Sequence, residues 1–285
     1  MKGLLMEKIS DQRYLKGQQY HDPRNLNARI KIHTLFSTAK QPWNDFVFSN
    51  IMLEDGISVL ELGCGNAMLW QEKASEVIPG CNVCLSDLSF GMITTAASRL
   101  RIHPNYSFIV SDSQQVPCQS RLFDRVIANH MLYHVPDIDC CISEVKRVLK
   151  PGGVFMAATN GEQHMSDLYD LVSEFEPAYQ PSEVKHKRFS IENGVSFIQP
   201  HFRYVSFIPY ISDLVVTDAT LLADYVFSMW DTTAVINNER YLQLINFFQA
   251  RIDRLGSIFI RKFTGIFIAA DDPAAFSSIS VLQAE

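Results

Sequence analysis

Two glycines that follow a short apolar run are the first residues whose spacing suggests chemistry. The run Val59-Leu60-Glu61-Leu62 predicts a buried strand, and Gly63, Cys64 and Gly65 follow it directly, ahead of a helical pattern. Glycine lets the chain turn sharply and lets a ligand approach bare backbone. Open α/β sheets bind their ligands at this position after a strand. The pattern therefore predicts a nucleotide-like ligand over this loop.

The residues around the loop favour a cationic ligand over a phosphate. A dinucleotide-binding loop has a further glycine, which lets its helix pack closely beside a pyrophosphate. Position 68 is instead Met68, and Glu61 places an acid just before the loop. A carboxylate at that position attracts a positive group on a ligand and repels a phosphate.

Asp87 follows the next predicted strand, 22 residues beyond Gly65. An acid at this position can accept hydrogen bonds from both hydroxyls of a ribose. It can also cap the following helix, because Ser86, Asp87 and Ser89 all precede the helical stretch that opens near Phe90. We favour the ribose role, because Asp87 coincides with the glycine loop.

The elements that must position these residues are strands alternating with helices. We expect strands at 58–62, 82–86, 106–110, 123–128 and 153–159, and helices at 67–77, 90–101 and 138–149. This alternation predicts a mostly parallel sheet flanked by helices. Beyond residue 160 we expect a helix at 163–177, strand-like runs at 202–211 and 257–269, and helices near 218–230 and 238–254.

The predicted division of the chain has five parts. Residues 1–52 are expected to form a helical lid, 53–160 the ligand-binding core, and 161–200 a cap inserted over the edge of the sheet. Residues 201–270 are expected to complete the core sheet with an antiparallel C-terminal strand. Residues 271–285 are expected to form a tail.

Composition and charge bound the class of protein. The 285 residues are 47% hydrophobic and 20% charged, which is ordinary for a soluble globular protein, and no apolar run is long enough for a membrane span. The net charge of −6 disfavours nucleic acid and anionic membranes as partners. We therefore expect a small-molecule partner, and a monomer or homodimer.

The six cysteines suggest reduced thiols, and hence a cytoplasmic location. Cys81 and Cys84 form a CxxC pair within an expected strand, where residues three apart face opposite sides. No second Cys or His pair stands nearby at ligand spacing, so we expect neither a metal site nor a redox pair.

Several short motifs, in order, resemble those of one family. They are the glycine loop, Ser86-Asp87-Leu88-Ser89, Ser111-Asp112-Ser113, Phe123 to Asn129, and Val148-Leu149-Lys150-Pro151-Gly152-Gly153. Together they resemble the class I, Rossmann-like methyltransferases that use S-adenosylmethionine, in particular the group called methyltransferase type 11. The resemblance implies a Rossmann-like sheet and S-adenosylmethionine as cofactor, with S-adenosylhomocysteine as its product.

By that resemblance, Glu61 and the glycine-loop backbone would face the methionine part of the cofactor. Asp87 would hold the ribose, with Leu88 against the adenine. Asp112 would accept a hydrogen bond from the adenine amino group, with Ser113 close by, although Asp112 also fits a turn or cap residue. Asn129 would contribute backbone contacts near the methionyl group.

The stretch after Asn129 holds the best candidates for the acceptor side. His130 is the first choice for a general base or an acceptor-facing residue, and Tyr133 and His134 could shape the pocket. Many members of the type 11 group resemble this Asn-x-x-x-x-His pattern whatever their substrate, so His134 also fits a residue that orients the loop. For the site residues His130, Tyr133 and His134, a direct role at the acceptor and a structural role in the loop or pocket both stay open.

The expected lid and cap carry further candidates. A lid over the cofactor could include Tyr14, Tyr20, Arg29, His33 and Trp43, with Arg29 near the cofactor's carboxylate. Trp43 and Phe46 fit ordinary helix packing better, and His33 fits a satisfied core histidine. The aromatic content of the cap suits an apolar acceptor or the cap's own core. Its residues are His164, Met165, Tyr169, Phe175, Tyr179 and Phe189.

Three functions follow from these features. The leading one is methyl transfer to an O, N or C atom of a small molecule by in-line displacement, which depends largely on placing the acceptor. A protein or RNA methyltransferase would instead need an open basic groove. A cyclase or regulator of the same fold would bind the cofactor without transferring its methyl group.

Overall fold

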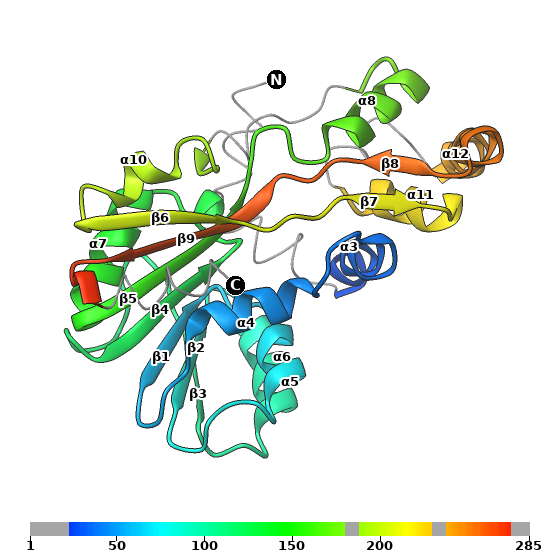
Figure 1. Cartoon of the computed structure of the whole chain (residues 1–285). Helices are drawn as coiled ribbons and strands as arrows, with labels where there is room; N and C mark the ends of the chain where they lie inside the picture. Colours follow the sequence, from blue (N-terminus) through cyan, green and yellow to red (C-terminus); the bar gives the residue numbers. More distant parts are fainter. Residues whose placement is uncertain (1–22, 180–187, 230–237, 275–285) are drawn as a thin grey trace.

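A seven-stranded sheet forms the centre of this computed structural model, which describes residues 23–179, 188–229 and 238–274 (Figure 1). Its strands are β1 (Ser58–Leu62), β2 (Asn82–Asp87), β3 (Tyr106–Val110), β4 (Phe123–Asn129), β5 (Leu149–Asn160), β6 (Tyr204–Pro209) and β9 (Thr264–Ala270). The strand order is β3-β2-β1-β4-β5-β9-β6. Strands β1 to β5 are parallel, and β9 lies antiparallel between β5 and β6. The predicted sheet is confirmed: β9 is its one antiparallel strand among the described residues, and β6 runs in the same direction as β5.

Helices cover both faces of this sheet. One face carries α4 (Trp43–Ile51), α5 (Met68–Lys73) and α6 (Phe90–Leu100), and the other carries α7 (Ile138–Val148) and α10 (Gly194–Ile198). Along β1, Val59 packs toward the first set of helices and Leu60 toward the second. Alternate residues of a strand face opposite sides. The sheet is therefore buried on both faces, which explains its nearly continuous apolar runs.

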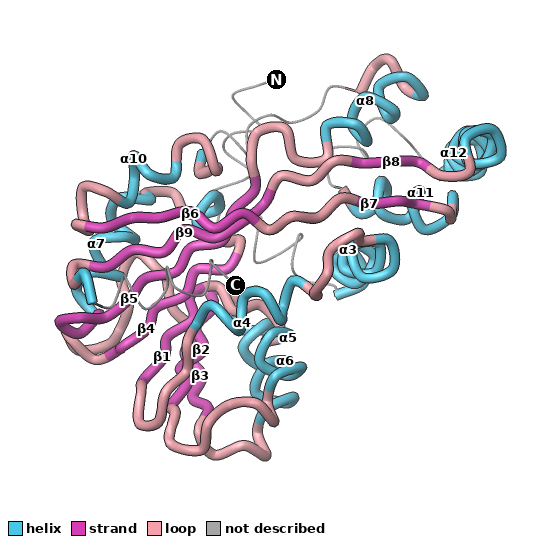
Figure 2. Tube along the Cα trace, in the orientation of Figure 1, coloured by secondary structure: helices cyan, strands magenta, loops and turns pink. Residues whose placement is uncertain are grey.

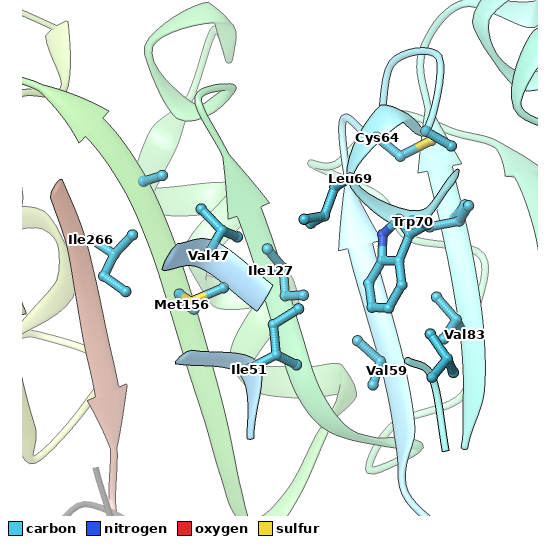
Figure 3. Close-up of a cluster of buried hydrophobic side chains, with 14 of the residues drawn as sticks. Val47, Ile51, Val59, Cys64, Leu69, Trp70, Val83, Ile127, Met156 and Ile266 are labelled. Atoms are coloured by element: carbon cyan, nitrogen blue, oxygen red, sulfur yellow. The ribbon is translucent and has the colours of Figure 1, made fainter. Parts of the chain in front are cut away.

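Helix α4 closes the first face of the sheet beside the glycine loop. Its residues Val47 and Ile51 lie in one buried cluster with Ile127 and Met156 of the sheet, and Trp70 of α5 belongs to the same cluster (Figure 3). Pro42 immediately precedes α4 and fits its first turn, where no backbone N–H is needed. The packing of α4 fixes the linker before it against the end of the sheet.

A second lobe lies beyond one end of the sheet (Figure 1). It contains α3 (Pro23–Phe36), α8 (Ser166–Phe175), β7 (Leu214–Val216), α11 (Ala219–Ser228), α12 (Tyr241–Leu255) and β8 (Ile258–Ile260). These elements share a hydrophobic cluster of their own, with Ile32, Leu222 and Phe248 fully buried in it. The longest of them, α12, has 15 residues, and none of the described helices is long and apolar enough to cross a membrane.

Two chain segments run side by side from the core sheet into the second lobe. The expected runs 202–211 and 257–269 are each interrupted, so that β6 and β9 pair in the core sheet whereas β7 and β8 pair in the lobe (Figure 2). At the interruption the Lys262 N–H donates to the Asp213 carboxylate (3.0 Å), and the Thr38 N–H donates to the Asp213 carbonyl (2.9 Å). Side-chain and linker contacts replace the strand ladder there. The described residues 214–229 and 238–260 thus lie in the lobe, and the expectation that all of 201–270 completes the core sheet was wrong.

The expected cap over residues 161–200 does not form one unit either. Helix α8 joins the second lobe, with Met165 and Tyr179 buried in its cluster and Phe175 packed against it. Farther along, Phe189 and Ile198 are buried in the sheet's own core. Each half of the segment is apolar enough to join a larger neighbouring core, which explains why it divides.

We predict that Ile51→Ala destabilises the protein by about 2–5 kcal/mol, because it leaves a cavity between α4 and the sheet. Ile51 is 2% exposed, whereas Ile102 is 79% exposed, so Ile102→Ala is the matched control and should change stability by no more than about 0.5 kcal/mol. Urea unfolding of both variants measures the difference. Equal stabilities would contradict this account of the core.

Candidate functional site

The glycine loop begins where β1 ends, and its backbone conformation requires glycine at Gly63. Gly63 has φ +65°, and a Cβ added there would lie 2.8 Å from the Cβ of Met131. Gly65 has φ +55° with open space around it, and Ala67 adopts a left-handed conformation as well, at φ +57°. The loop therefore turns sharply and leaves bare backbone beside the cavity, as the sequence predicted.

Asp87 joins the glycine loop to the end of β2. One carboxylate oxygen accepts from the Gly65 N–H (2.9 Å) and the other from the Ser89 N–H (2.8 Å). Burial raises the pKa of the Asp87 carboxyl, although these N–H groups act in the opposite direction. The cap of α6 is Ser89, whose hydroxyl accepts from the Met92 N–H. Asp87 is therefore a loop anchor that lines the cavity, and its ribose role stays a prediction.

Glu61 lies on the face of β1 that carries α5. It is 2% exposed, and its carboxylate accepts a hydrogen bond of 2.6 Å from the Trp70 indole N–H. Burial raises the pKa of Glu61 to about 7; the Trp70 hydrogen bond lowers it, and the charge of Asp87 raises it further. Glu61 therefore lines the cavity as an acid whose pKa lies close to neutral pH.

Asp112 and Ser113 follow β3 and line the cavity, as does Leu88, which follows β2. The Asp112 carboxylate accepts from the Gln114 backbone N–H (2.9 Å) and from the Gln114 side-chain amide (3.0 Å). Asp112 therefore does form a turn, which was one of its two expected roles. The turn and a ligand contact are compatible, because a carboxylate has several acceptor sites.

Asn129 and His130 form the corner at the end of β4. His130 has φ +55°, which is uncommon for a residue other than glycine and is typical of functional sites. Its ring lies 4.9 Å from the ring of Trp43. The Asn129 side-chain oxygen is buried and has no hydrogen-bond partner among the described residues.

The loop with Tyr133 and His134 is held from outside the cavity. Arg188 donates to the backbone carbonyls of Tyr133 (3.2 Å), Val135 (2.6 Å) and Pro136 (3.0 Å). The rings of Tyr133 and His134 lie 4.6 Å apart, and both residues line the cavity. Arg188 thus fixes the shape of this loop.

These residues surround one cavity of about 850 Å³ that continues to the second lobe. The first end holds the glycine loop, Asp87 and Asp112. The far end is lined by side chains from the second lobe, from the junction between the lobes and from the turn between β5 and α8. They include His33, Asn160, His164, Tyr169, Tyr210, Tyr225 and Lys262. His130 and Trp43 lie among the lining residues too, and the Trp43 ring is 5.1 Å from that of Tyr210.

His33 differs from its predicted role as a satisfied core histidine. It lies deep in the protein but lines the cavity, and its Nδ1 atom is buried with no hydrogen-bond partner among the described residues. Burial lowers the pKa of His33 to about 3, and the positive charges of Lys262 and His130 add to this effect. His33 is therefore neutral at physiological pH.

The other residues of the predicted lid differ in where they lie. Trp43 lines the cavity, whereas Phe46 is buried in the sheet's core, as expected for helix packing. Tyr14 and Tyr20 lie outside the described residues. Arg29 belongs to α3, but the structure does not describe its side chain. The roles of Tyr20 and Arg29 at the cofactor stay predictions.

The cavity residues that sequence reasoning missed include Tyr210, Tyr225 and Lys262. Lys262 stands in an apolar run that was expected to be one continuous strand. The pair Arg261-Lys262 within that run was the available signal, because adjacent charges are unusual in a buried strand. Tyr210 and Tyr225 gave no local signal, since they reach the cavity only through the packing of the two lobes.

We predict that Glu61 makes stability depend on pH. The folded protein raises the pKa of Glu61 from 4.5 to about 7, so the folded state binds the proton more tightly than the unfolded state. The resulting stabilisation is complete below pH 4.5 and is lost as pH rises toward about 7. Wild type should therefore lose about 2–3 kcal/mol more than Glu61→Gln between roughly pH 5 and pH 8.

Denaturant unfolding at both pH values measures this difference, with the exposed carboxylate variant Glu162→Gln as control. The control should follow wild type. A wild-type profile parallel to that of Glu61→Gln would show that Glu61 ionises freely in the folded protein.

Comparison with known proteins gives the family. Residues 53–194, about half of the chain, match a family described as a methyltransferase domain. A sterol 24-C-methyltransferase from Gibberella zeae is 29% identical over 128 residues, which are 44% of this chain and 32% of that protein. A ubiquinone/menaquinone biosynthesis C-methyltransferase from Coxiella burnetii is 28% identical over 114 residues, 39% of this chain and 46% of that protein. The matched part thus spans about a third to about half of the length of these curated relatives.

Solved structures share the fold. Phosphoethanolamine N-methyltransferase 2 of Haemonchus contortus has a TM-score of 0.56 at 18% identity, over 92% of this chain and 60% of that one. The YcgJ protein of Bacillus subtilis has a TM-score of 0.54 at 14% identity, over 80% of this chain and 98% of that one. These structures show the shared fold. The domain match, with the strand order of the sheet, shows that the chain belongs to the class I, Rossmann-like family of S-adenosylmethionine-dependent methyltransferases.

Proposed function

We propose that the chain transfers the methyl group of S-adenosylmethionine to an O, N or C atom of a small-molecule acceptor. The observation that carries the proposal is that one continuous cavity joins the glycine loop to an aromatic end formed with the second lobe. Its volume of about 850 Å³ lies within the range of ligand pockets, roughly 300–1,000 Å³. One cavity of this size suits two small ligands that meet end to end.

The residues at the loop end suit the chemistry of S-adenosylmethionine. Two side-chain atoms there, Asn66 Nδ2 and Asn129 Oδ1, are buried without a hydrogen-bond partner among the described residues. Buried polar groups are nearly always satisfied, so such atoms are typical of a site that a polar ligand completes. Glu61 and Asp87 add carboxylates that favour a ligand with positive groups and hydroxyls.

Each residue would do a distinct task in transfer. Asp87 would accept hydrogen bonds from the ribose hydroxyls while holding the Gly65 N–H, and Asp112 would accept from the adenine amino group. Glu61 would stabilise the positive charge of the methionine part. When bound, the cofactor supplies a methyl group already activated on a sulfonium.

The acceptor end would act mainly by placing the acceptor and excluding water, because an activated donor needs little more. His130 lies at the end of β4, at the corner between the two ends of the cavity, and could accept a proton from an acceptor that must lose one. Trp43 packs beside His130, and Tyr210 packs against Trp43, so both rings would exclude water. His134 and Tyr133 would shape the wall.

A small-molecule acceptor is supported over a nucleic acid or protein. An open groove for nucleic acid needs several Lys and Arg side chains to neutralise phosphates. Among the described residues that line the cavity, Lys262 alone is a lysine or arginine. The two curated relatives are named for sterol and quinone methylation, which also fits a small acceptor. The six cysteines are all free thiols, which suits the cytoplasm.

We predict that Asp87→Ala weakens the binding of S-adenosylhomocysteine by at least about 1–2 kcal/mol, roughly 5–30-fold, because charge-assisted hydrogen bonds are lost. Calorimetry measures the affinity, and Asp139→Ala, which removes an exposed acid on α7, is the control. Asp87→Asn keeps one acceptor oxygen for the loop, so its affinity for S-adenosylhomocysteine should lie between those of wild type and Asp87→Ala. Unchanged affinity in a folded Asp87→Ala protein would show that Asp87 does not contribute to cofactor binding.

We predict that the protein moves a labelled methyl group from S-adenosylmethionine into the small-molecule fraction of a metabolite extract. Asp87→Ala should abolish most of this transfer at a cofactor concentration near the wild-type dissociation constant, because the site is then mostly empty. Label found only in protein or RNA would contradict a small-molecule acceptor. Cofactor binding with no formation of S-adenosylhomocysteine would indicate a protein that binds the cofactor without methyl transfer.

A further inference from the structure

The ionisable side chains divide between the two ends of the cavity. All four carboxylates that line it lie at the cofactor end, on or after β1, β2 and β3 and on α5: Glu61, Glu72, Asp87 and Asp112. The far end is lined by Lys262 and by the neutral His33, with His164 nearby, and by no carboxylate among the described residues. A ligand that lies along the cavity therefore meets negative groups first and a positive group last.

Lys262 has few partners for a half-buried ammonium group. Its Nζ donates to the Ser212 hydroxyl (3.0 Å) and lies 5.5 Å from the centre of the Tyr210 ring. No carboxylate among the described residues lies within salt-bridge distance of it. The ammonium has three hydrogens, so two of them have no acceptor from this part of the chain.

The nearest acid does not neutralise Lys262 directly. Asp213 attracts its charge from a distance, but one oxygen of Asp213 accepts from the Lys262 backbone N–H at 3.0 Å. Burial lowers the pKa of Lys262 to about 8, so the side chain is still mainly charged at neutral pH. Withdrawing a charge from water is unfavourable unless it gains a partner, and charged groups in clefts with few partners are frequent binding residues.

The position of Lys262 is built into the fold. It stands at the interruption between β8 and β9, where Asp213 binds its backbone N–H and Ser212 binds its side chain. Ser212 is itself linked to Ser37 by a hydroxyl contact of 2.8 Å. The ammonium is thus fixed at the junction of the lobes, where it faces the cavity beside Tyr210.

We propose that the methyl acceptor is an anion, and that Lys262 binds its negative group at the far end of the cavity. The proposal rests on the methyltransferase function proposed above. The rings of Tyr210 and Trp43 connect Lys262 to the corner at His130, because Tyr210 lies beside Lys262 and Trp43 contacts both Tyr210 and His130. Tyr225 adds a third aromatic ring to the cavity wall, so the body of the acceptor is apolar. A small acid with an apolar body fits both the aromatic wall and the Lys262 ammonium, and its negative group is a carboxylate or a phosphate.

The test compares the binding of matched probes to the full-length protein saturated with S-adenosylhomocysteine. Benzoate and phenyl phosphate are the anions with an aromatic body, benzamide is the neutral match, and hexanoate with hexanamide tests an aliphatic body. Ligand-detected NMR titration gives the dissociation constants. Wild type should bind at least one anion about tenfold or more tightly than the neutral amide with the same body, which is benzamide for the two aromatic anions and hexanamide for hexanoate. This is the scale of one charge-assisted hydrogen bond. The tighter of benzoate and phenyl phosphate identifies the anionic group.

Variants separate binding by Lys262 from a structural role. Lys262→Met keeps the apolar stem and should reduce the preference for the anion to about twofold or less, while Lys262→Arg should restore most of it. The exposed Lys40→Met is the control and should bind as wild type does. Calorimetry should give the same affinity for S-adenosylhomocysteine in all variants, because Lys262 lies at the other end of the cavity.

Two results would overturn the proposal. One is the absence of any anion preference in wild type, and the other is a preference that survives in Lys262→Met. Loss of S-adenosylhomocysteine binding in wild type would instead overturn the function on which the proposal rests. The two failures are therefore distinguishable in one set of samples.

Discussion

The Asp87 carboxylate holds together the parts on which the site depends. The parallel strands β1 and β2 end at the same edge of the sheet, and each is followed by a loop. By accepting from the Gly65 N–H and the Ser89 N–H, Asp87 ties one loop to the other. Because the strand order also reverses direction beside β1, the crevice at this edge is where an α/β sheet binds its ligand. The remaining acceptor sites of Asp87 are left to the cavity.

The second lobe extends this crevice into a larger cavity. The ribbon of β6 and β9 continues into β7 and β8 after an interruption, and the linker between α3 and α4 binds at the same place through Thr38 and Asp213. This junction brings residues from distant parts of the chain to the far end of the cavity, among them His33 and Lys262. Both carry an energetic cost that packing alone does not explain. His33 leaves a buried nitrogen without a partner, and Lys262 loses water around its charge.

The core of the site could be predicted from the sequence because its signals are local. The strand before Gly63, the acid at Asp87 and the turn residue Asp112 each stand within a short segment whose apolar run and breakers show where the strand ends. Parallel strands then bring those ends to one edge, so that local motifs become neighbours. The structure places all three at the cavity, although it tests none of their contacts with a cofactor.

The far end could not be predicted because it depends on tertiary packing. Lys262 lies in a run that has the pattern of one strand, and only the contacts of Asp213 and the α3–α4 linker divide it. His33 has the pattern of a core histidine, and its place at the cavity follows from how α3 packs on α11 in the second lobe. In both cases the deciding contacts join residues far apart in the chain. The expected cap over 161–200 failed for the same reason.

A crystal structure of the protein with S-adenosylhomocysteine tests the central claim most directly. The account predicts the adenosine between Asp87 and Asp112, with its ribose hydroxyls on Asp87. It places the homocysteine part along the glycine loop and the sulfur toward the corner at His130. The cavity beyond it should stay open toward Lys262. A ligand bound elsewhere, or bound with its ribose away from Asp87, would contradict the account.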